Sequence, residues 1–222
     1  RHVAEYRDKE ICRHLIGRIA AVSTRPVRIM EVCGTHTVSI FRSGIRSMLP
    51  ATIELLSGPG CPVCVTAQGE IDAAVDLARQ KGVILATSGD LIRVPGTESS
   101  LQKEKARGAD VRIVYSASDA VEIARQHPGK QVVFLGVGFE TTAPTIAAAV
   151  LGAHRAGVDN FFVFAMHKIV PPALSALMDT PGVNIDAFLL PGHVSVIIGT
   201  QAYEPFYQQY GVPCAVAGFE PA

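Results

Sequence analysis

The sequence alternates short, continuous apolar runs with segments whose apolar residues recur every three or four positions. A run of the first kind is typical of a buried strand, and a segment of the second kind is typical of an amphipathic helix. Strands that are apolar along their whole length favour parallel sheets covered by helices on both faces. The sequence therefore predicts an α/β fold.

Each expected element follows from this periodicity and from the Gly and Pro residues between the segments. We expect strands at 27–32, 52–56, 83–86, 111–115, 131–137, 160–166, 186–190 and 212–217. We expect helices at 9–22, 38–43, 67–81, 101–107, 118–126, 143–156 and 171–178, and a further helix that ends near residue 200.

The two halves of the sequence align at a constant offset. Gly34 and Gly138 are 104 residues apart, Gly89 and Gly192 are 103 apart, and all four follow expected strands. This offset predicts two similar α/β domains, one over 1–115 and the other over 116–222. The alternative is one continuous sheet in which similar strand and helix lengths recur by chance.

Composition excludes several classes of protein. Of 222 residues, 48% are hydrophobic and 18% are charged, as expected for a globular chain with a large core. Lys and Arg together number 20, as do Asp and Glu, so no excess of charge indicates binding to nucleic acid or to an anionic membrane. The apolar runs are too short to span a bilayer. The first residues are charged and lack Met, so we expect no signal peptide and a missing start.

The cysteines indicate a reducing compartment. Five cysteines, unevenly spaced, do not form the framework expected of a small secreted protein, so we expect the cytoplasm. Cys12 lies in the first expected helix and Cys214 in the last expected strand, and both are interpreted as inert thiols.

Residues with distinctive chemistry follow the expected strands. In open α/β sheets, ligands bind beyond the carboxyl ends of the strands, where helix N-termini offer free N–H groups. This pattern predicts one shared functional face. The residues concerned are Cys33, His36, Cys61, Cys64, Asp90, Glu140, His167 and His193.

The Cys61-Pro62-Val63-Cys64 motif precedes a helix, as in thiol–disulfide couples. A helix N-terminus also favours the thiolate, which is the reactive form. The motif alone supplies only two of the four ligands of a structural zinc site, and the sequence has no second CxxC. Cys33 and His36 would add a thiolate and an imidazole, enough for an open iron or zinc site if the two loops face each other. The remaining alternative is a pair of free thiols.

Other candidate residues allow several interpretations. Gly136-Val137-Gly138 lacks the third glycine of a dinucleotide fingerprint, so nucleotide binding is a weak hypothesis. Glu140 fits a helix-start carboxylate or a general base. His167 and His193 fit ligands, proton carriers or ordinary polar loop residues.

Four motifs together resemble the family of [NiFe]-hydrogenase maturation factors HypD. They are Glu31-Val32-Cys33-Gly34-Thr35-His36-Thr37, Gly58-Pro59-Gly60-Cys61-Pro62-Val63-Cys64-Val65-Thr66, Gly138-Phe139-Glu140-Thr141-Thr142-Ala143-Pro144 and Pro191-Gly192-His193-Val194-Ser195. The resemblance covers essentially the whole chain, including Gly218-Phe219-Glu220-Pro221 near its end.

The resemblance implies a scaffold on which the Fe(CN)2CO group is assembled with the small chaperone HypC, rather than a conventional turnover enzyme. It implies two α/β domains facing a cleft, and cyanide delivered by HypE. By motif, Cys33 would bind the iron together with a cysteine of HypC, and Thr35 and His36 would support it. Cys61 and Cys64 would be the redox pair through which electrons pass between an iron–sulfur cluster and the iron. Glu140 and His193 would line the cleft.

The family also has a third domain with a [4Fe-4S] cluster, whose cysteines lie in its C-terminal part. This sequence ends at Ala222 with Cys214 alone in its last stretch, so we expect a truncated chain that does not hold the cluster. Two hypotheses compete with the scaffold. One is a stand-alone thiol–disulfide oxidoreductase that uses Cys61 and Cys64, and the other is a nucleotide-binding enzyme.

Overall fold

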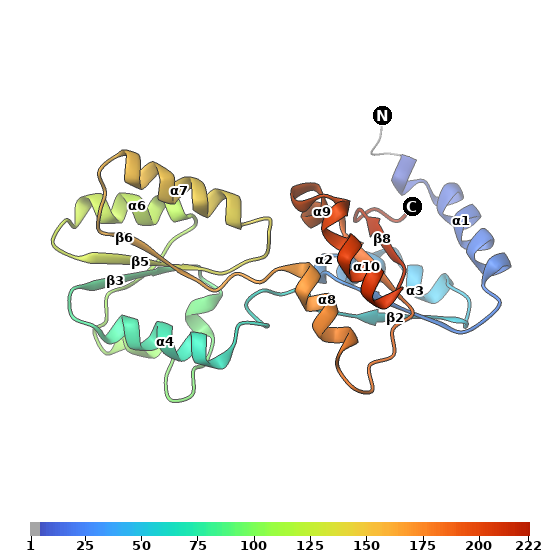
Figure 1. Ribbon diagram of the computed structural model, residues 1–222, viewed down its shortest axis with the longest axis horizontal. Coiled ribbons are helices and arrows are strands. Elements are labelled where there is room, and N and C mark those ends of the chain that lie inside the picture. Colours follow the sequence, from blue (N-terminus) through green and yellow to red (C-terminus); the bar gives the residue numbers. More distant parts are fainter. Residues whose placement is uncertain (1–4) are drawn as a thin grey trace. The chain divides into compact units, whose positions relative to one another are not determined.

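The computed structural model describes residues 5–222 (Figure 1). The chain forms two compact units. Unit 1 combines Arg1–Cys61 with Val170–Ala222, and unit 2 is the continuous segment Pro62–Ile169. Over the described residues, none of the helices is both long enough and apolar enough to pass through a bilayer.

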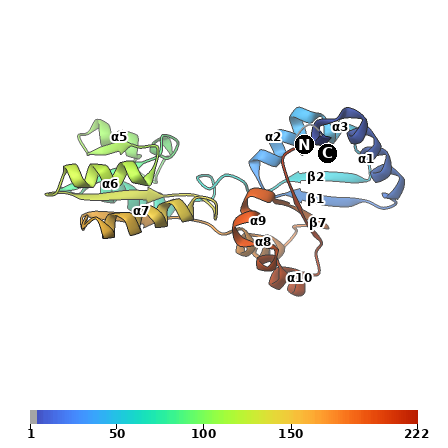
Figure 2. The ribbon, with the colours of Figure 1, turned by 90° about the horizontal axis from the view of Figure 1, so that it is seen from above.

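Unit 1 is built on a four-stranded parallel sheet in the order β2-β1-β7-β8. In Figure 2, α1, α2 and α3 lie on one side of this sheet, and α8, α9 and α10 lie on the other. The strands are β1 (Val27–Glu31), β2 (Ile53–Ser57), β7 (Ala187–Pro191) and β8 (Cys214–Ala217). The helices are η1 (Glu5–Arg7), α1 (Lys9–Val22), α2 (Gly34–Ser43), α3 (Ile45–Met48), α8 (Val170–Met178), α9 (Gly192–Ile198), η3 (Thr200–Tyr203) and α10 (Glu204–Tyr210).

Unit 2 is built on a second four-stranded parallel sheet, in the order β4-β3-β5-β6. Its α4 covers one face, and α6 and α7 cover the other (Figure 1). The strands are β3 (Val83–Thr87), β4 (Val111–Ile113), β5 (Gln131–Gly136) and β6 (Phe161–Ala165). The helices are α4 (Gln68–Arg79), η2 (Leu91–Arg93), α5 (Leu101–Ala106), α6 (Ala117–Gln126) and α7 (Ala143–Arg155).

The strand β3 explains why unit 2 has helices on both faces. Successive side chains of a strand point to opposite faces. Val83 and Leu85 pack under α4, whereas Ile84 and Ala86 pack under α6 and α7. Every residue of β3 is buried. A strand that is apolar on both faces gains stability only when both faces are covered, as the sequence pattern predicts.

The two sheets follow the same topological plan. Each sheet consists of two pairs of consecutive strands, and the first strand of each pair lies at the centre of the sheet, β1 beside β7 and β3 beside β5. The second strands, β2 and β8 in one sheet and β4 and β6 in the other, lie at the edges. The connections from the central strands to the edge strands therefore run in opposite directions. Such a switch point leaves a crevice beyond the carboxyl ends of the two central strands, where α/β proteins bind ligands.

The predicted α/β class and the parallel sheets are confirmed, and the alternative of one continuous sheet is wrong. The predicted boundary between 1–115 and 116–222 differs from the division in the structure, because it falls inside unit 2. The chain leaves unit 1 after β2 and returns to it at α8, so each half contributes one strand pair to each sheet. The offset of 104 residues relates strand pairs rather than domains.

Three helical segments differ from the expectation. α2 begins at Gly34 instead of residue 38, so His36 lies in a helix and not in a loop. α3 and α10 were not predicted, because both are short and α10 carries several polar residues. The earlier start of α2 matters most, since it places two candidate ligands in one helical turn.

Candidate functional site

Cys33 lies at the switch point of unit 1, two residues after β1. It is the N-cap residue of α2, and its Sγ accepts a hydrogen bond from the backbone N–H of Thr35 at 3.4 Å. The side chain of Cys33 is a free thiol in a buried residue. Negative charge on this sulfur would be stabilised by the N–H groups of the first turn. Thr35, predicted as a site residue, contributes this N–H and is itself exposed.

His36 follows in the first turn of α2 and is 2% exposed. Its Nε2 lies 2.9 Å from the carbonyl oxygen of Gly218 and 3.3 Å from that of Ala217. Because a carbonyl oxygen only accepts, Nε2 carries the hydrogen, and a neutral ring then has its lone pair on Nδ1. This Nδ1 is buried and has no hydrogen-bond partner within residues 5–222. An imidazole held in this way presents an unused lone pair.

His193 belongs to the same region of unit 1, in the first turn of α9 after β7. Its ring centroid lies 5.2 Å from that of Phe219, which also lies 4.8 Å from the ring of His36. Burial lowers the pKa of His193, and its electrostatic interaction with His36 lowers it further. Both effects favour the neutral ring of His193.

The Gly58-Pro59-Gly60 segment packs against the start of α2. A Cβ on Gly60 would overlap the backbone nitrogen of Gly34 and lie 2.6 Å from the carbonyl carbon of Cys33. A Cβ on Gly58 would lie 2.7 Å from the carbonyl oxygen of Glu31. The two glycines thus allow the chain leading into Cys61 to touch the Cys33 turn, which explains their place in the motif.

Cys61 and Cys64 are both disulfide-bonded. Cys12, Cys33 and Cys214 are free thiols. The CxxC cysteines therefore differ in chemical state from Cys33, which keeps a free thiol.

A buried carboxylate anchors the start of α2. Glu31, at the end of β1, is 0% exposed. Its carboxylate accepts a hydrogen bond from the Thr37 hydroxyl at 2.5 Å and pairs with the Arg46 guanidinium at 3.1 Å. In the sequence, Glu31 was recognised only as part of a motif, without a role of its own. Because a buried charge needs partners, this pair fixes the helix that carries Cys33 and His36.

Unit 2 places its candidate residues at the carboxyl ends of β5 and β6. Glu140 is 8% exposed and lies in the loop between β5 and α7. His167 follows β6, and a Cβ on Gly136 would lie 2.9 Å from its Cε1 atom. The His167 Nε2 is buried and has no hydrogen-bond partner in the described chain, and burial lowers the pKa of this ring. Lys168 pairs with Glu70 at 2.8 Å.

The donor atoms of unit 1 suit a soft transition metal but do not complete a site. Within residues 5–222, no three His, Cys, Asp or Glu side chains are grouped as a metal ion would require. The sulfur of Cys33 and the free Nδ1 of His36 offer two donors from one helical turn. Thiolate and imidazole both suit iron, zinc and copper. Further ligands would have to come from outside this turn.

Two contributors to the site were missed in the sequence. Phe219 contacts both histidine rings, and the carbonyl groups of Ala217 and Gly218 hold His36. The one indication in the sequence was that Ala217 ends the last strand, since ligand sites form beyond strand ends. Any residue type can offer a backbone carbonyl, so the contacts of Ala217 and Gly218 with His36 could not be predicted from the sequence.

Comparison with known proteins gives a consistent result. A family model described as "HypD: Hydrogenase formation hypA family" matches residues 10–222. The Hydrogenase maturation factor HypD of Escherichia coli K12 is 49% identical over 228 residues, covering 100% of this chain and 61% of that protein. The factor of the same name from Rhodobacter capsulatus is 47% identical, covering 98% and 60%. A putative hydrogenase expression/formation protein of Methanocaldococcus jannaschii is 44% identical, covering 96% and 60%. The chain thus spans about 60% of the length of these relatives.

Proposed function

Because the chain belongs to the HypD family, we propose that it takes part in hydrogenase maturation and that unit 1 holds iron during assembly of the Fe(CN)2CO group. Cys33 is the proposed iron-binding thiolate, and His36 supports it. The iron is cargo, which passes on to the hydrogenase.

The observation that carries this proposal is the state of His36. Its Nε2–H is directed to backbone carbonyl groups, and its buried Nδ1 has no hydrogen-bond partner in the described residues. A metal-binding histidine almost always donates its other N–H to a carbonyl or carboxylate, which fixes the tautomer and the ring. The thiol of Cys33 begins the same helical turn. A soft thiolate suits low-spin iron with CO and cyanide ligands.

Two protein ligands leave positions open on the iron. We propose that a cysteine of the chaperone HypC supplies a further ligand, and that HypE delivers the cyanide. Two donors from one turn, with no third His, Cys, Asp or Glu grouped with them in residues 5–222, suit a site that is completed by a partner.

The CxxC motif is proposed as the electron relay. Reduction of a disulfide takes up two electrons and two protons, and its reoxidation releases them. Cys61 and Cys64 are disulfide-bonded, and the segment before Cys61 touches the Cys33 turn. Glu140 of unit 2 and His193 of unit 1 are proposed to handle protons in this chemistry, since both are carried by loops or helices at strand ends.

The test uses the protein copurified with HypC, analysed for iron and by infrared spectroscopy. CO and cyanide ligands have stretching bands in a region free of protein absorption. We expect bands and bound iron in the wild type and in Cys12→Ala, and neither in Cys33→Ala. Equal iron in the two variants would exclude Cys33 as the ligand.

A stand-alone thiol–disulfide oxidoreductase is the alternative, and the family assignment does not favour it. Such a protein would reduce a disulfide substrate such as insulin catalytically, and its rate would not depend on Cys33. We expect no such turnover.

A further inference from the structure

We propose that the turn Ala217–Phe219, which begins at the last residue of β8, is a positioning element of the site, and that Phe219 is a positioning residue for His36. This inference rests on the proposed iron site and adds a part of unit 1 with no assigned role. Three independent contacts support it: two backbone acceptors, one aromatic ring and a set of hydrogen bonds that fix the turn.

The backbone of the turn decides which nitrogen of His36 is free. The carbonyl oxygens of Ala217 and Gly218 lie 3.3 and 2.9 Å from Nε2. Since both atoms can only accept, the hydrogen stays on Nε2 and the lone pair stays on Nδ1. The turn thereby selects the tautomer that can bind a metal ion through Nδ1.

The ring of Phe219 restricts both histidines. It lies 4.8 Å from the His36 ring and 5.2 Å from the His193 ring, each at an interplanar angle of 51°. Tilted ring pairs at such distances are attractive. A ligand ring that is packed on one side loses less rotational freedom when it binds, so its affinity for metal is higher.

The turn is itself held in place. The Ser39 hydroxyl of α2 donates to the carbonyl oxygen of Phe219, and the Phe219 N–H donates to the Glu220 carboxylate at 3.0 Å. A Cβ on Gly218 would lie 2.6 Å from that carboxylate, so a larger residue would displace it. These contacts link α2, which carries His36, to the turn that orients its ring.

The first measurement needs no metal. Nitrogen chemical shifts of the histidine rings, from NMR of the 15N-labelled chain, report the tautomer. We expect His36 in the Nε2–H form, assigned by its absence in the spectrum of His36→Ala. The Nδ1–H form would overturn the inference, because Nδ1 would then have no lone pair to offer.

The second measurement titrates the whole chain with Co²⁺ under anaerobic conditions, in a Cys61→Ser/Cys64→Ser background. The thiolate charge-transfer band reports Cys33, and the visible d–d bands report the remaining ligands. Loss of an outer-shell partner typically lowers metal affinity by about 10- to 100-fold. We expect Phe219→Leu to lower Co²⁺ affinity by about tenfold and to shift the d–d bands toward those of His36→Ala, while the thiolate band persists.

Two variants control for packing. Phe219→Tyr keeps the ring and should bind Co²⁺ like the background protein. Phe206→Leu removes a buried ring that contacts Phe188 and Tyr210 but neither histidine, and it should also bind normally. Unchanged affinity and bands in Phe219→Leu would overturn the inference, as would equal losses in Phe206→Leu. If Cys33→Ala kept the thiolate band, the proposed iron site itself would fail.

Discussion

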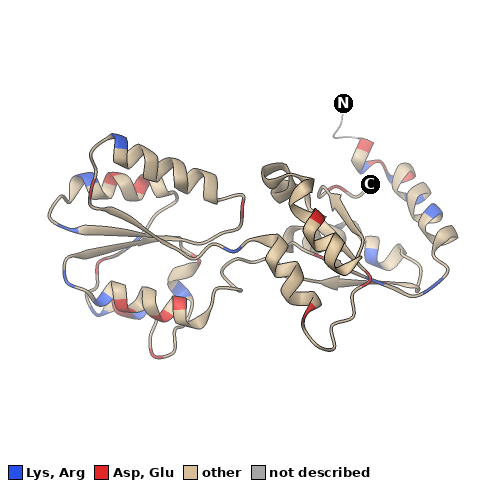
Figure 3. Cartoon of the chain, in the orientation of Figure 1, with Lys and Arg blue, Asp and Glu red and all other residues tan. Residues whose placement is uncertain are grey.

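The two units share a sheet order but use their polar residues differently. Figure 3 shows many positions of charged residues on the helices of unit 2 and few on α8, α9 and α10 of unit 1. Unit 1 has a thiol and two imidazoles at its switch point. One topological plan thus carries a thiol and two imidazoles at the strand ends of unit 1 and a network of ion pairs on the surface of unit 2.

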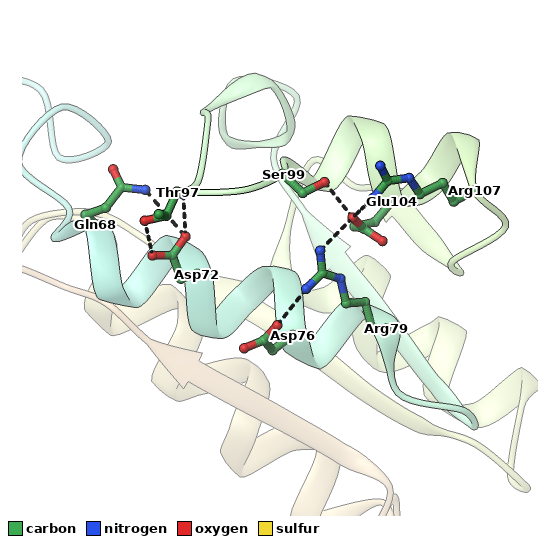
Figure 4. A network of polar contacts seen from close by, with 8 residues as sticks. All are labelled: Gln68, Asp72, Asp76, Arg79, Thr97, Ser99, Glu104 and Arg107. Atoms are coloured by element: carbon green, nitrogen blue, oxygen red, sulfur yellow. Dashed lines mark hydrogen bonds and ion pairs between the residues drawn. The ribbon is translucent and has the colours of Figure 1, made fainter.

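The ion pairs of unit 2 form a network that fixes one loop and one helix on α4 (Figure 4). Glu104 of α5 accepts from Arg79 at 3.1 Å, from Arg107 at 2.9 Å and from Ser99 at 2.5 Å. Asp72 accepts hydrogen bonds from the backbone and side chain of Thr97 at 2.6 and 2.7 Å. These contacts stabilise unit 2.

The largest effect on stability is expected when one glycine of each unit is replaced by alanine. A Cβ on Gly60 would meet the backbone of Cys33 and Gly34, which cannot move without displacing the site. A Cβ on Gly138 of unit 2 would overlap the Oγ1 of Thr142 and lie 2.8 Å from its Cβ, so only Thr142 and the loop that carries it would have to shift. We expect Gly60→Ala to lower the free energy of unfolding of unit 1 by about 3 kcal/mol, and Gly138→Ala to lower that of unit 2 by about 1 kcal/mol.

Chemical denaturation followed by NMR probes in each unit would measure both values. Gly69→Ala is the control, because a Cβ at that position of α4 meets no atom within 4 Å. A smaller loss for Gly60→Ala than for Gly138→Ala would contradict the close contact between the two motifs of unit 1.

Acid should affect unit 2 strongly. Hydrogen bonds from Arg79 and Ser99 lower the pKa of Glu104 from 4.5 to about 2, and Arg112 with Lys130 lowers the pKa of Asp110 from 3.8 to about 2. Because the folded-state pKa values are depressed, the stabilisation is complete above pH 4.5 and is lost as the pH falls toward 2. The pKa values of Glu70 and Asp72 are also lowered, by Lys168 and by Thr97.

We therefore expect the hydrogen-exchange protection factors of unit 2, taken relative to the intrinsic rate at each pH, to fall between about pH 4.5 and 2 before those of unit 1 do. In Glu104→Gln, part of this pH dependence should disappear, since the side chain no longer titrates. Earlier loss of protection in unit 1, or an unchanged pH profile in Glu104→Gln, would argue against the assigned network.

The smallest effect is expected at the helix caps. Ser116 caps α6, which buries four residues, through a hydrogen bond from the Asp119 N–H at 3.2 Å. Asp8 caps α1, none of whose residues is buried, through N–H groups at 2.8 and 3.1 Å. Ser116→Ala should lower the stability of unit 2 by about 1 kcal/mol, whereas Asp8→Ala should only fray α1. Circular dichroism with thermal unfolding would separate the outcomes, and a lowered midpoint for Asp8→Ala would contradict the weak packing of α1.

The sequence predicted the α/β class and the strand ends because both depend on local apolar periodicity. It missed the unit boundary, because parallel strands pair over any sequence distance and nothing local marks β1 as the neighbour of β7. The residue types of Cys33 and His36 marked them as candidates for the site. The sequence could not predict the carbonyl groups that hold His36 or the overlap at Gly60, since these depend on packing between distant segments.

The central claim is that iron binds at the Cys33 turn, while the CxxC motif exchanges electrons. Iron content of the complex with HypC tests it most directly, in Cys33→Ala and in Cys61→Ser/Cys64→Ser. We expect the first variant to lose its iron, and the second to retain iron but fail to complete the Fe(CN)2CO group. Iron retained in Cys33→Ala and lost in the double variant would contradict it.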